Sequence, residues 1–474
     1  MKATFHNTSI KGIYTIVPPK VIDIDSELDT IYKGDKKGLE RIKKVIGLQT
    51  RHIAEKHITA SDLGLQAATR LLESLNVERE SIDALIFVTQ SPDYFCPASA
   101  CYLQGKLGLS QSCLSFDINQ ACAGYLYGLY VAHSLCDSGG ANRVLLIVGD
   151  TLSKFVNPLD SNLAPMMGDG VSATLLERNL ARHSACGDFL GNAADASLRR
   201  MCNLQVWISP TATSPHSLTL HNPKNSLTIL ECQDSSDTES QADSTHQDPS
   251  NSKIFDEKCG LQGKSQGSYL SGDLCDFSQL PHLSQNEVSL EKAELQKEHY
   301  FELGSDGSKF HQLIIPQGAC RIPTKEIITD SKVWETSESR SLKDLYMDGA
   351  EIFSFAVSTY PKTFQGIIDY AQCDKDRIDY FFFHQANKYI VDNITRSLGL
   401  PKEKVPNTTT NKYGNLSGCS IPATICDTLA ELASNGLDSP LRVHLAGFGA
   451  GLAWGNAVVT LDKGFKCQKV GVYE

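Results

Sequence analysis

Short, unbroken apolar runs recur in both halves of the chain. The segment Ser81–Val88 has a charged start followed by a continuous apolar run, and Arg377–His384 repeats this pattern. Runs of this kind are typical of strands that are buried on both faces of a largely parallel sheet. Each run leads into a helical pattern that closes on Leu-Gly-Leu, at 107–109 and at 398–400.

A second pair of predicted strands repeats in the same way. Val144–Asp150 and Val443–Phe448 are each followed by a Gly-rich turn, at Gly168–Gly170 and at Gly449–Gly451, and then by a further strand. Those further strands are Ala173–Leu176 and Ala457–Leu461, and helical patterns cover Ala60–Leu75, Ala123–Cys136, Ile352–Ala371 and Pro422–Ala433. This alternation predicts an α/β fold built from an internally duplicated unit.

The composition changes sharply between the two halves. Residues 233–252 contain no aromatic side chain and no aliphatic side chain larger than that of Ala, so they bury too little apolar surface to offset the entropy of ordering. We therefore interpret 181–296 as an acidic, Ser/Gln-rich and partly disordered insertion between two folded halves, 1–180 and 297–474. A lid or a partner-docking module is the alternative interpretation of this insertion.

The charge and the terminus exclude several classes of protein. The 474-residue chain has 44 Lys and Arg against 55 Asp and Glu, a formal net charge of −11. This balance argues against a nucleic-acid-binding protein and against a polybasic membrane-surface protein. No apolar run approaches the ~20 residues of a membrane span, and Met1–Asn7 lacks the apolar stretch of a secretory signal. The 15 cysteines form no CxxC pair, so we expect free thiols in a cytoplasmic protein and no metal site.

Cys122 is the first candidate for chemistry. An apolar strand pattern ends at Ile118, and a helix of small and apolar residues starts near Cys122. A thiol at the start of a helix lies near unpaired N–H groups and the positive end of the dipole, which favours the thiolate. The alternative is a packed core cysteine, which is the commoner situation for an isolated cysteine.

His384 and Asn415 are the other two candidates. His384 ends a predicted strand, and ligands of open α/β folds gather at the carboxyl ends of strands. Its imidazole would donate to a developing oxyanion or exchange a proton there, whereas the alternative is a histidine with only structural hydrogen bonds. Asn415 lies in a loop between Gly and Pro residues, where its amide would donate a neutral hydrogen bond. The alternative for Asn415 is a turn residue in the left-handed conformation.

Taken together, these three places resemble the β-ketoacyl-acyl-carrier-protein synthase III family of thiolase-like condensing enzymes. Further matches to that family are Gly47–Ala54, Gly168–Gly170, Leu303–Gly307 and Gly447–Gly455. The resemblance covers 1–180 and 297–474. It implies the thiolase-like architecture, in which two duplicated halves form five α/β/α/β/α layers.

The resemblance also implies a reaction. Cys122 would attack the thioester of an acyl primer, and a malonyl-type extender would then lose carbon dioxide to give an enolate. His384 and Asn415 would hold the enolate oxygen, and the backbone N–H groups of Cys122 and Ala450 would form the oxyanion hole. The product is a β-ketoacyl thioester for fatty-acid or specialised lipid and polyketide synthesis. No cofactor is bound, because the substrates arrive as thioesters of coenzyme A or of an acyl-carrier protein, and the enzyme is expected to be a homodimer.

Several positions depart from the family pattern. The family's Trp that stacks on the adenine of coenzyme A is Arg41 here, and three nucleotide-contacting Arg positions hold Val45, Ser161 and Tyr389. A carrier protein is therefore a plausible acyl donor, and Arg41, Lys43 and Lys44 are its candidate docking residues. Cys96 stands where a larger residue of the partner subunit often closes the acyl pocket, which suggests a longer or bulkier primer.

Two other functions remain open. The first is an acyltransferase on the same scaffold that passes the acyl group to an oxygen or nitrogen nucleophile. The second is a non-catalytic partner subunit. The presence of both His384 and Asn415 favours condensation over the acyltransferase. The presence of Cys122 argues against the non-catalytic subunit.

Overall fold

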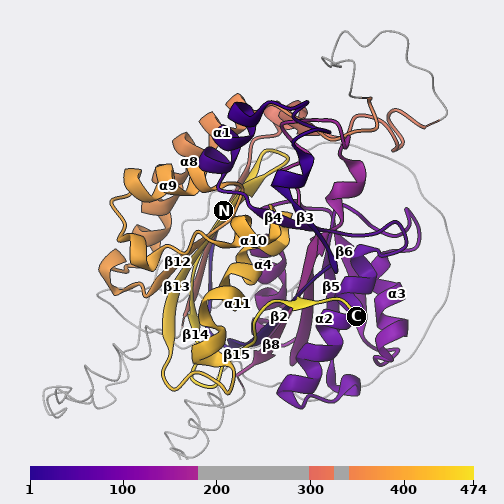
Figure 1. The fold of residues 1–474 in the computed structure, drawn as a ribbon. Coiled ribbons are helices and arrows are strands. Elements are labelled where there is room, and N and C mark those ends of the chain that lie inside the picture. Colours follow the sequence, from indigo (N-terminus) through magenta and orange to yellow (C-terminus); the bar gives the residue numbers. More distant parts are fainter. Residues whose placement is uncertain (180–297, 325–340) are drawn as a thin grey trace, which may run out of the picture. The chain divides into compact units, whose positions relative to one another are not determined.

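The computed structural model describes residues 1–179, 298–324 and 341–474 (Figure 1). They belong to one compact unit, Met1–Gly187 with Leu283–Glu474, and a second unit, Asp188–His282, lies outside the described residues. The predicted insertion at 181–296 also lies outside them, so its character stays a prediction.

A seven-stranded sheet forms from residues of the first half and from the C-terminal segment. Its order is β15-β2-β8-β7-β5-β6, and β16 pairs with β2. The strands are β2 Thr8–Val17, β5 Ala84–Val88, β6 Leu114–Ile118, β7 Arg143–Asp150, β8 Gly170–Arg178, β15 Lys466–Cys467 and β16 Gly471–Val472. The middle strand β5 is parallel to both β6 and β7, whereas β8 is antiparallel to β7 and to β2.

A five-stranded sheet repeats this arrangement in the order β1-β9-β14-β13-β12. Its strands are β1 Lys2–Phe5, β9 His299–Ser305, β12 Tyr380–Phe383, β13 Leu441–Gly449 and β14 Ala453–Leu461. β12 is parallel to β13, and β14 is antiparallel to both β13 and β9. The series β12-β13-β14-β9 therefore has the directions of β5-β7-β8-β2, which confirms the duplication predicted from the repeated apolar runs.

Helices form the remaining three layers. Between the two sheets lie α4 and α11, outside the seven-stranded sheet lie α2 and α3, and outside the five-stranded sheet lie α8 and α9 (Figure 1). Their bounds are α2 Ala60–Leu75, α3 Ser99–Leu107, α4 Gly124–Asp137, α8 Gly349–Tyr370, α9 Lys388–Ser397 and α11 Ser420–Ala433. The predicted five-layer α/β/α/β/α architecture is confirmed.

The helices of the central layer consist of small and apolar residues because they are buried between the two sheets. Both α4 and α11 have sheet on two sides, so nearly every face is buried, and Leu126, Leu129 and Ile425 belong to one core that also contains both sheets. Gly128 lets α4 approach the seven-stranded sheet closely, because a Cβ there would lie 2.6 Å from Leu146. A helix that is apolar all round is typical of such a fully buried position.

Shorter elements border the two sheets. They are α1 Lys36–Ile46, α10 Thr409–Tyr413, the antiparallel pair of β3 Lys20–Asp23 with β4 Thr50–Ile53, and the pair of β10 Leu313–Ile314 with β11 Tyr346–Met347. A 3₁₀ turn, η9 Ser417–Cys419, leads directly into α11. The start of α1 is capped by the Asp35 side chain, and Gly47 ends the helix with a φ of 79°.

Candidate active site

Cys122 lies in the turn between β6 and α4, two residues before the helix begins. The end of β13 comes close to it. A Cβ on Gly449 would lie 2.8 Å from the Cβ and 3.3 Å from the Sγ of Cys122, and a Cβ on Gly447 would lie 2.9 Å from its carbonyl oxygen. Only glycine at these positions lets the second half of the chain approach the nucleophile so closely.

The predicted thiolate of Cys122 is wrong for the free protein. Burial raises the pKa of the Cys122 thiol to about 12; the Ser417 hydroxyl lowers this pKa and the nearby Asp150 carboxyl raises it. Because α4 begins at Gly124, the residue lies outside the helix, and loss of hydration outweighs the attraction of the helix end. At neutral pH the residue is a thiol, so its proton needs an acceptor when it attacks.

His384 follows β12 and is held by two hydrogen bonds. Its backbone N–H donates to the Ala446 carbonyl at 2.7 Å, which continues the parallel ladder, and its Nδ1 lies 2.6 Å from the Ser420 hydroxyl. The Ser420 oxygen also accepts the N–H of Gln385 at 3.3 Å, so its own hydrogen is available to Nδ1. Donation to Nδ1 leaves the hydrogen of the neutral ring on Nε2. Burial lowers the pKa of His384 to about 3, so the imidazole is neutral.

The Asn415 side chain is also fixed. Its Oδ1 accepts the backbone N–H of Ser417 at 3.0 Å, which leaves its amide N–H groups to donate elsewhere. Its backbone N–H donates to Met166, and its carbonyl accepts from Gly168. The left-handed conformation proposed as the alternative belongs instead to Ser417, at a φ of 52°, and Asn415 does not adopt it.

Two motifs from the sequence analysis hold this loop in place. Asp169 of the Gly-Asp-Gly turn accepts from the N–H of Ala54 at 2.7 Å, and its own N–H donates to the His52 carbonyl at 2.8 Å. Gly168 lies against the loop of Asn415, since a Cβ there would be 2.0 Å from the Tyr413 carbonyl oxygen. The matches at 47–54 and 168–170 therefore support the position of Asn415.

Ser417 connects the three candidate residues. Its Oγ lies 3.8 Å from the Sγ of Cys122, and its N–H donates to Asn415. Its carbonyl lies beside the imidazole of His384, where it opposes the lowering of the pKa. The structure thus brings together the nucleophile from one half and the two donors from the other. Sequence reasoning missed Ser417, although it stands two residues after Asn415 in the same loop.

The predicted oxyanion hole consists of two backbone groups. Within the described residues, neither the N–H of Cys122 nor that of Ala450 donates to a backbone carbonyl. Ala450 follows Gly449, whose backbone is in contact with Cys122. The absence of a backbone acceptor for both N–H groups is consistent with the predicted oxyanion hole, which stays a prediction.

Known proteins resemble this chain over most of its length. The chain matches the 3-oxoacyl-(acyl-carrier-protein) synthase III family over residues 116–192 and the C-terminal domain of that family over residues 368–461. A Campylobacter jejuni protein, provisionally named 3-oxoacyl-(acyl-carrier-protein) synthase 3, is 38% identical, and the alignment covers 97% of this chain and 95% of that protein. The chain belongs to the 3-oxoacyl-(acyl-carrier-protein) synthase III family.

Other proteins of the same family also resemble this chain over most of its length. A Rhodopirellula baltica protein named β-ketoacyl-(acyl-carrier-protein) synthase III is 31% identical, with 87% of each chain covered. The crystal structure of a 3-oxoacyl-(acyl-carrier protein) synthase from Burkholderia xenovorans has a TM-score of 0.70 and 27% identity, and the match covers 100% of this chain and 99% of that one.

The basic residues of α1 differ in their surroundings. Arg41 and Lys44 are exposed, whereas Lys43 forms an ion pair with Asp25 at 2.8 Å and another with Glu40 at 3.6 Å. Lys43 thus joins α1 to the segment after β3, which makes it a weaker docking residue than its two neighbours.

Two of the positions that the resemblance marks as departures lie at the end of α1 and at the start of α9. Val45 and Tyr389 are both exposed, and the ring of Tyr389 stacks on Phe353 with centroids 5.4 Å apart. A Cβ on Gly47 would lie 2.6 Å from the Cβ of Lys388, so the end of α1 and the start of α9 are in contact. Val45 and Tyr389 therefore present apolar side chains to solvent where these two helices meet.

Cys96 is not part of the catalytic cluster of its own chain. It is exposed in the loop before α3, next to Phe95, whose side chain is 88% exposed. The predicted contribution of Cys96 to the acyl pocket of a partner subunit stays a prediction.

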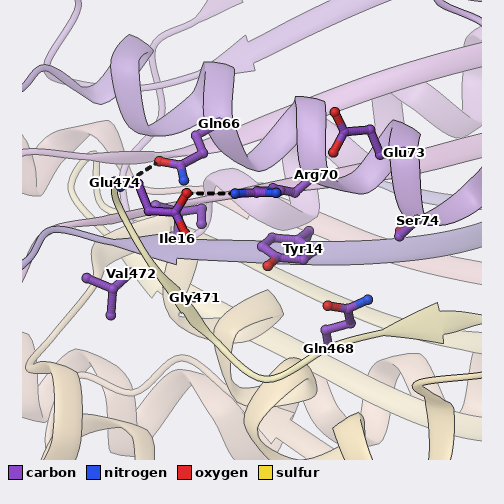
Figure 2. A pocket seen from close by; sticks show the side chains of 10 residues that line it. All are labelled: Tyr14, Ile16, Gln66, Arg70, Glu73, Ser74, Gln468, Gly471, Val472 and Glu474. Carbon is purple, nitrogen blue, oxygen red and sulfur yellow. Dashed lines mark hydrogen bonds and ion pairs between the residues drawn. The ribbon is translucent and has the colours of Figure 1, made fainter.

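A groove lies outside the catalytic cluster, where the C-terminal segment crosses β2 and α2 (Figure 2). It has a volume of about 520 Å³, and its lining includes Arg70, which pairs with Glu474 at 2.7 Å. A hollow of about 480 Å³ lies beside Met167, the neighbour of the Gly-Asp-Gly turn, and the Arg51–Glu27 ion pair forms part of its wall. Neither hollow is lined by Cys122, His384 or Asn415.

In the part of the chain that the structure describes, no three His, Cys, Asp or Glu side chains form a group that could hold a metal ion. Over the same residues, no helix is both long enough and apolar enough to cross a membrane.

Proposed function

We propose that this protein catalyses a decarboxylative Claisen condensation between a Cys122-bound acyl primer and a malonyl-type thioester. The observation that supports this most directly is the arrangement around Ser417, where Cys122, His384 and Asn415 meet. A nucleophile beside two fixed, neutral donors suits a reaction that first forms a covalent acyl-enzyme and then an enolate.

In the first half-reaction the Cys122 sulfur attacks the primer thioester and the donor thiol leaves. The tetrahedral oxyanion would accept from the N–H groups of Cys122 and Ala450. These are backbone groups that need no reorganisation when charge develops.

In the second half-reaction the extender loses carbon dioxide and its enolate attacks the acyl carbonyl carbon. His384 and Asn415 would hold the enolate oxygen. Since burial lowers the pKa of His384 to about 3, its ring is a neutral donor over the physiological pH range, as the Asn415 amide is. Neutral donors stabilise the enolate without trapping it as a tight ion pair.

We further propose that a carrier protein delivers the primer, with coenzyme A thioesters as weaker donors. The exposed Val45 and the stacked Tyr389 provide no charged group for a nucleotide, whereas Arg41 and Lys44 are available to an acidic carrier surface. The reaction uses no resident metal or cofactor.

The proposed enzyme is a cytoplasmic homodimer. β6 is an edge strand of its sheet, and Leu114 at its start is 51% exposed, as expected for a strand that pairs with a second copy.

The remaining two functions fit the site less well. An acyltransferase to an oxygen or nitrogen nucleophile has no need for two enolate donors, and both are held in place here. A non-catalytic partner subunit has no need for a thiol in a glycine-lined turn.

The experiment is intact-mass spectrometry after exposure to a panel of acyl-coenzyme A and acyl-carrier donors, followed by a condensation assay. Cys122→Ala should abolish the mass increase, whereas Cys101→Ala, which removes an exposed thiol, should retain it. His384→Ala and Asn415→Ala should still be acylated but should lose condensation by ~10²–10³-fold, the usual effect of removing one oxyanion donor. An acylated Cys122→Ala protein, or a donor variant that condenses at the parent rate, would contradict the corresponding role.

A further inference from the structure

The segment that leads into α11 contacts both of the proposed enolate donors. Each donor has an atom that accepts hydrogen bonds and a group that donates them: the Asn415 side chain has Oδ1 and an NH₂ group, and a neutral imidazole has one bare nitrogen and one N–H. Only the donating group can stabilise an enolate oxygen. In both residues the accepting atom is engaged by this segment, Oδ1 of Asn415 by the N–H of Ser417 and Nδ1 of His384 by the hydroxyl of Ser420.

Ser420 is the first residue of α11, and it is fully buried. Its oxygen lies 2.6 Å from Nδ1 of His384 and accepts the backbone N–H of Gln385 at 3.3 Å. Among the described residues, Nδ1 is the one acceptor within hydrogen-bond distance of this hydroxyl. A buried hydroxyl without an acceptor is costly, so the Ser420 hydrogen is directed to Nδ1.

The position of the imidazole ring is fixed by other contacts. The ring of His384 packs edge-on against Phe448, with centroids 5.5 Å apart and an angle of 81° between the planes. The side-chain amide of the next residue, Gln385, donates to the carbonyls of Phe383 at 3.1 Å and Pro406 at 3.2 Å, which anchors the turn after β12. The open question for this ring is therefore which nitrogen carries its hydrogen.

We propose that Ser420 is a positioning residue that keeps the hydrogen of His384 on Nε2 and thereby makes the imidazole a donor to the enolate. The hydrogen bond made by one ring nitrogen sets the protonation of the other. Without the Ser420 hydroxyl, Nδ1 can carry the hydrogen, and a bare Nε2 would then present its lone pair to the enolate oxygen. This proposal rests on the proposed function, because it concerns the decarboxylation step of that same site.

The proposed role affects one half-reaction and not the other. In the first acyl transfer the oxyanion would accept from backbone N–H groups, which are independent of the state of an imidazole. In the second, the bond between the α-carbon and the carboxylate carbon of the extender breaks, carbon dioxide leaves, and the electron pair remains as the enolate. No proton passes to or from His384, which only donates a hydrogen bond. Loss of Ser420 should therefore slow condensation and spare acylation.

The test measures the two half-reactions separately in the full chain. Acylation is followed by rapid quench and intact mass, and condensation by release of carbon dioxide from a malonyl-carrier thioester. Ser420→Ala should be acylated within about threefold of the parent rate and should condense at least ~10-fold more slowly, up to the ~10²–10³-fold expected when one oxyanion donor is removed. Ser420→Gly also removes the hydroxyl and carries the same expectation, so the test does not depend on the folding of one variant.

Ser172→Ala is the matched control. Ser172 is also fully buried, and its hydroxyl lies 2.6 Å from the Thr15 hydroxyl and 3.1 Å from the Cys419 sulfur. The substitution removes a buried hydroxyl with two partners, but none of its partners is a proposed enolate donor. Both half-reactions of this variant should match those of the parent.

A nitrogen NMR spectrum of the histidine-labelled protein separates a change of tautomer from a general loss of structure. The two nitrogens of a neutral imidazole differ in chemical shift, and the His384 signals are those missing from His384→Ala. The hydrogen should be on Nε2 in the parent and at least partly on Nδ1 in Ser420→Ala.

Three results for Ser420→Ala would overturn this role of Ser420. They are condensation at the parent rate, a loss of acylation as large as the loss of condensation, and a His384 hydrogen that stays wholly on Nε2. A parent protein that no donor acylates would instead overturn the proposed function.

Discussion

Acid should destabilise this fold steeply, because four buried histidines are neutral in the folded state. Burial lowers the pKa of His299 to about 4 and those of His384 and His444 to about 3, and it holds the pKa of His133 well below its ordinary value. In the unfolded chain each imidazole returns to about 6.5. The unfolded state thus binds more protons than the folded state at any pH between about 6.5 and the folded values, and stability is lost as the pH falls through this window.

The size of the effect follows from the same values. Between pH 7.5 and pH 5.5 each buried histidine costs about 1.4 kcal/mol, so four cost about 5 kcal/mol. Asp169 acts in the opposite direction, because burial raises its pKa to about 6 and the folded state then takes up a proton; this returns about 1 kcal/mol. The net loss of about 4 kcal/mol is a large part of the ~5–15 kcal/mol that stabilises a typical domain.

The assay is urea unfolding at pH 7.5, 6.5 and 5.5. His444→Gln should lose about 1.4 kcal/mol less stability than the parent between pH 7.5 and pH 5.5, because a Gln amide replaces the contact of Nε2 with the Asn456 side chain, 3.2 Å away, but does not titrate. His57→Gln is the matched control, since the His57 side chain is 76% exposed and should leave the slope unchanged. Equal slopes for the parent and the His444→Gln protein would refute the reasoning.

Three further results are expected. Gly449→Ala should fold but acylate at least tenfold more slowly, because its Cβ would lie 3.3 Å from the Cys122 sulfur, whereas Gly307→Ala has open space around it and should match the parent in the mass assay. In a competition, medium-chain acyl-carrier donors should acylate the protein faster than acetyl-coenzyme A, and a clear preference for acetyl-coenzyme A would contradict the carrier proposal. Replacing 181–296 by a short Gly/Ser linker should leave a soluble dimer in gel filtration, because residues on both sides of that segment contact the Thr8 carbonyl oxygen; an insoluble product would show that the segment supplies core.

Much of the architecture could be predicted because each buried strand is a continuous apolar run that is visible in the local sequence. The helix predicted at Ala60–Leu75 has the observed bounds, and the strand predicted at Val144–Asp150 begins one residue earlier, at Arg143. Such runs are apolar on both faces, so tertiary context does not alter their pattern. The two-stranded sheet of β3 and β4 was not predicted, since its four-residue strands carry no comparable signal.

The sequence names the residues of the proposed site, but it does not report their electrostatics. Cys122, His384 and Asn415 stand in recognisable motifs, and the structure brings them together. The ionisation of Cys122 depends on how completely the second half of the chain covers it, which no local pattern reports. Ser417 was missed for a similar reason, because its importance comes from its contact with Cys122, which lies 295 residues away in sequence.

The duplication explains how one site acquires two kinds of chemistry. Thr89 follows β5 in the first half, and His384 follows β12 at the equivalent place in the second. Cys122 precedes α4 as Ser417 precedes α11, and the two helices begin beside each other, since a Cβ on Gly418 would lie 2.9 Å from the Ala121 carbonyl oxygen. Equivalent positions thus hold the proposed nucleophile in one half and the proposed donors in the other. Neither half contains a complete set, so the chemistry depends on the packing of the two halves across the central helices.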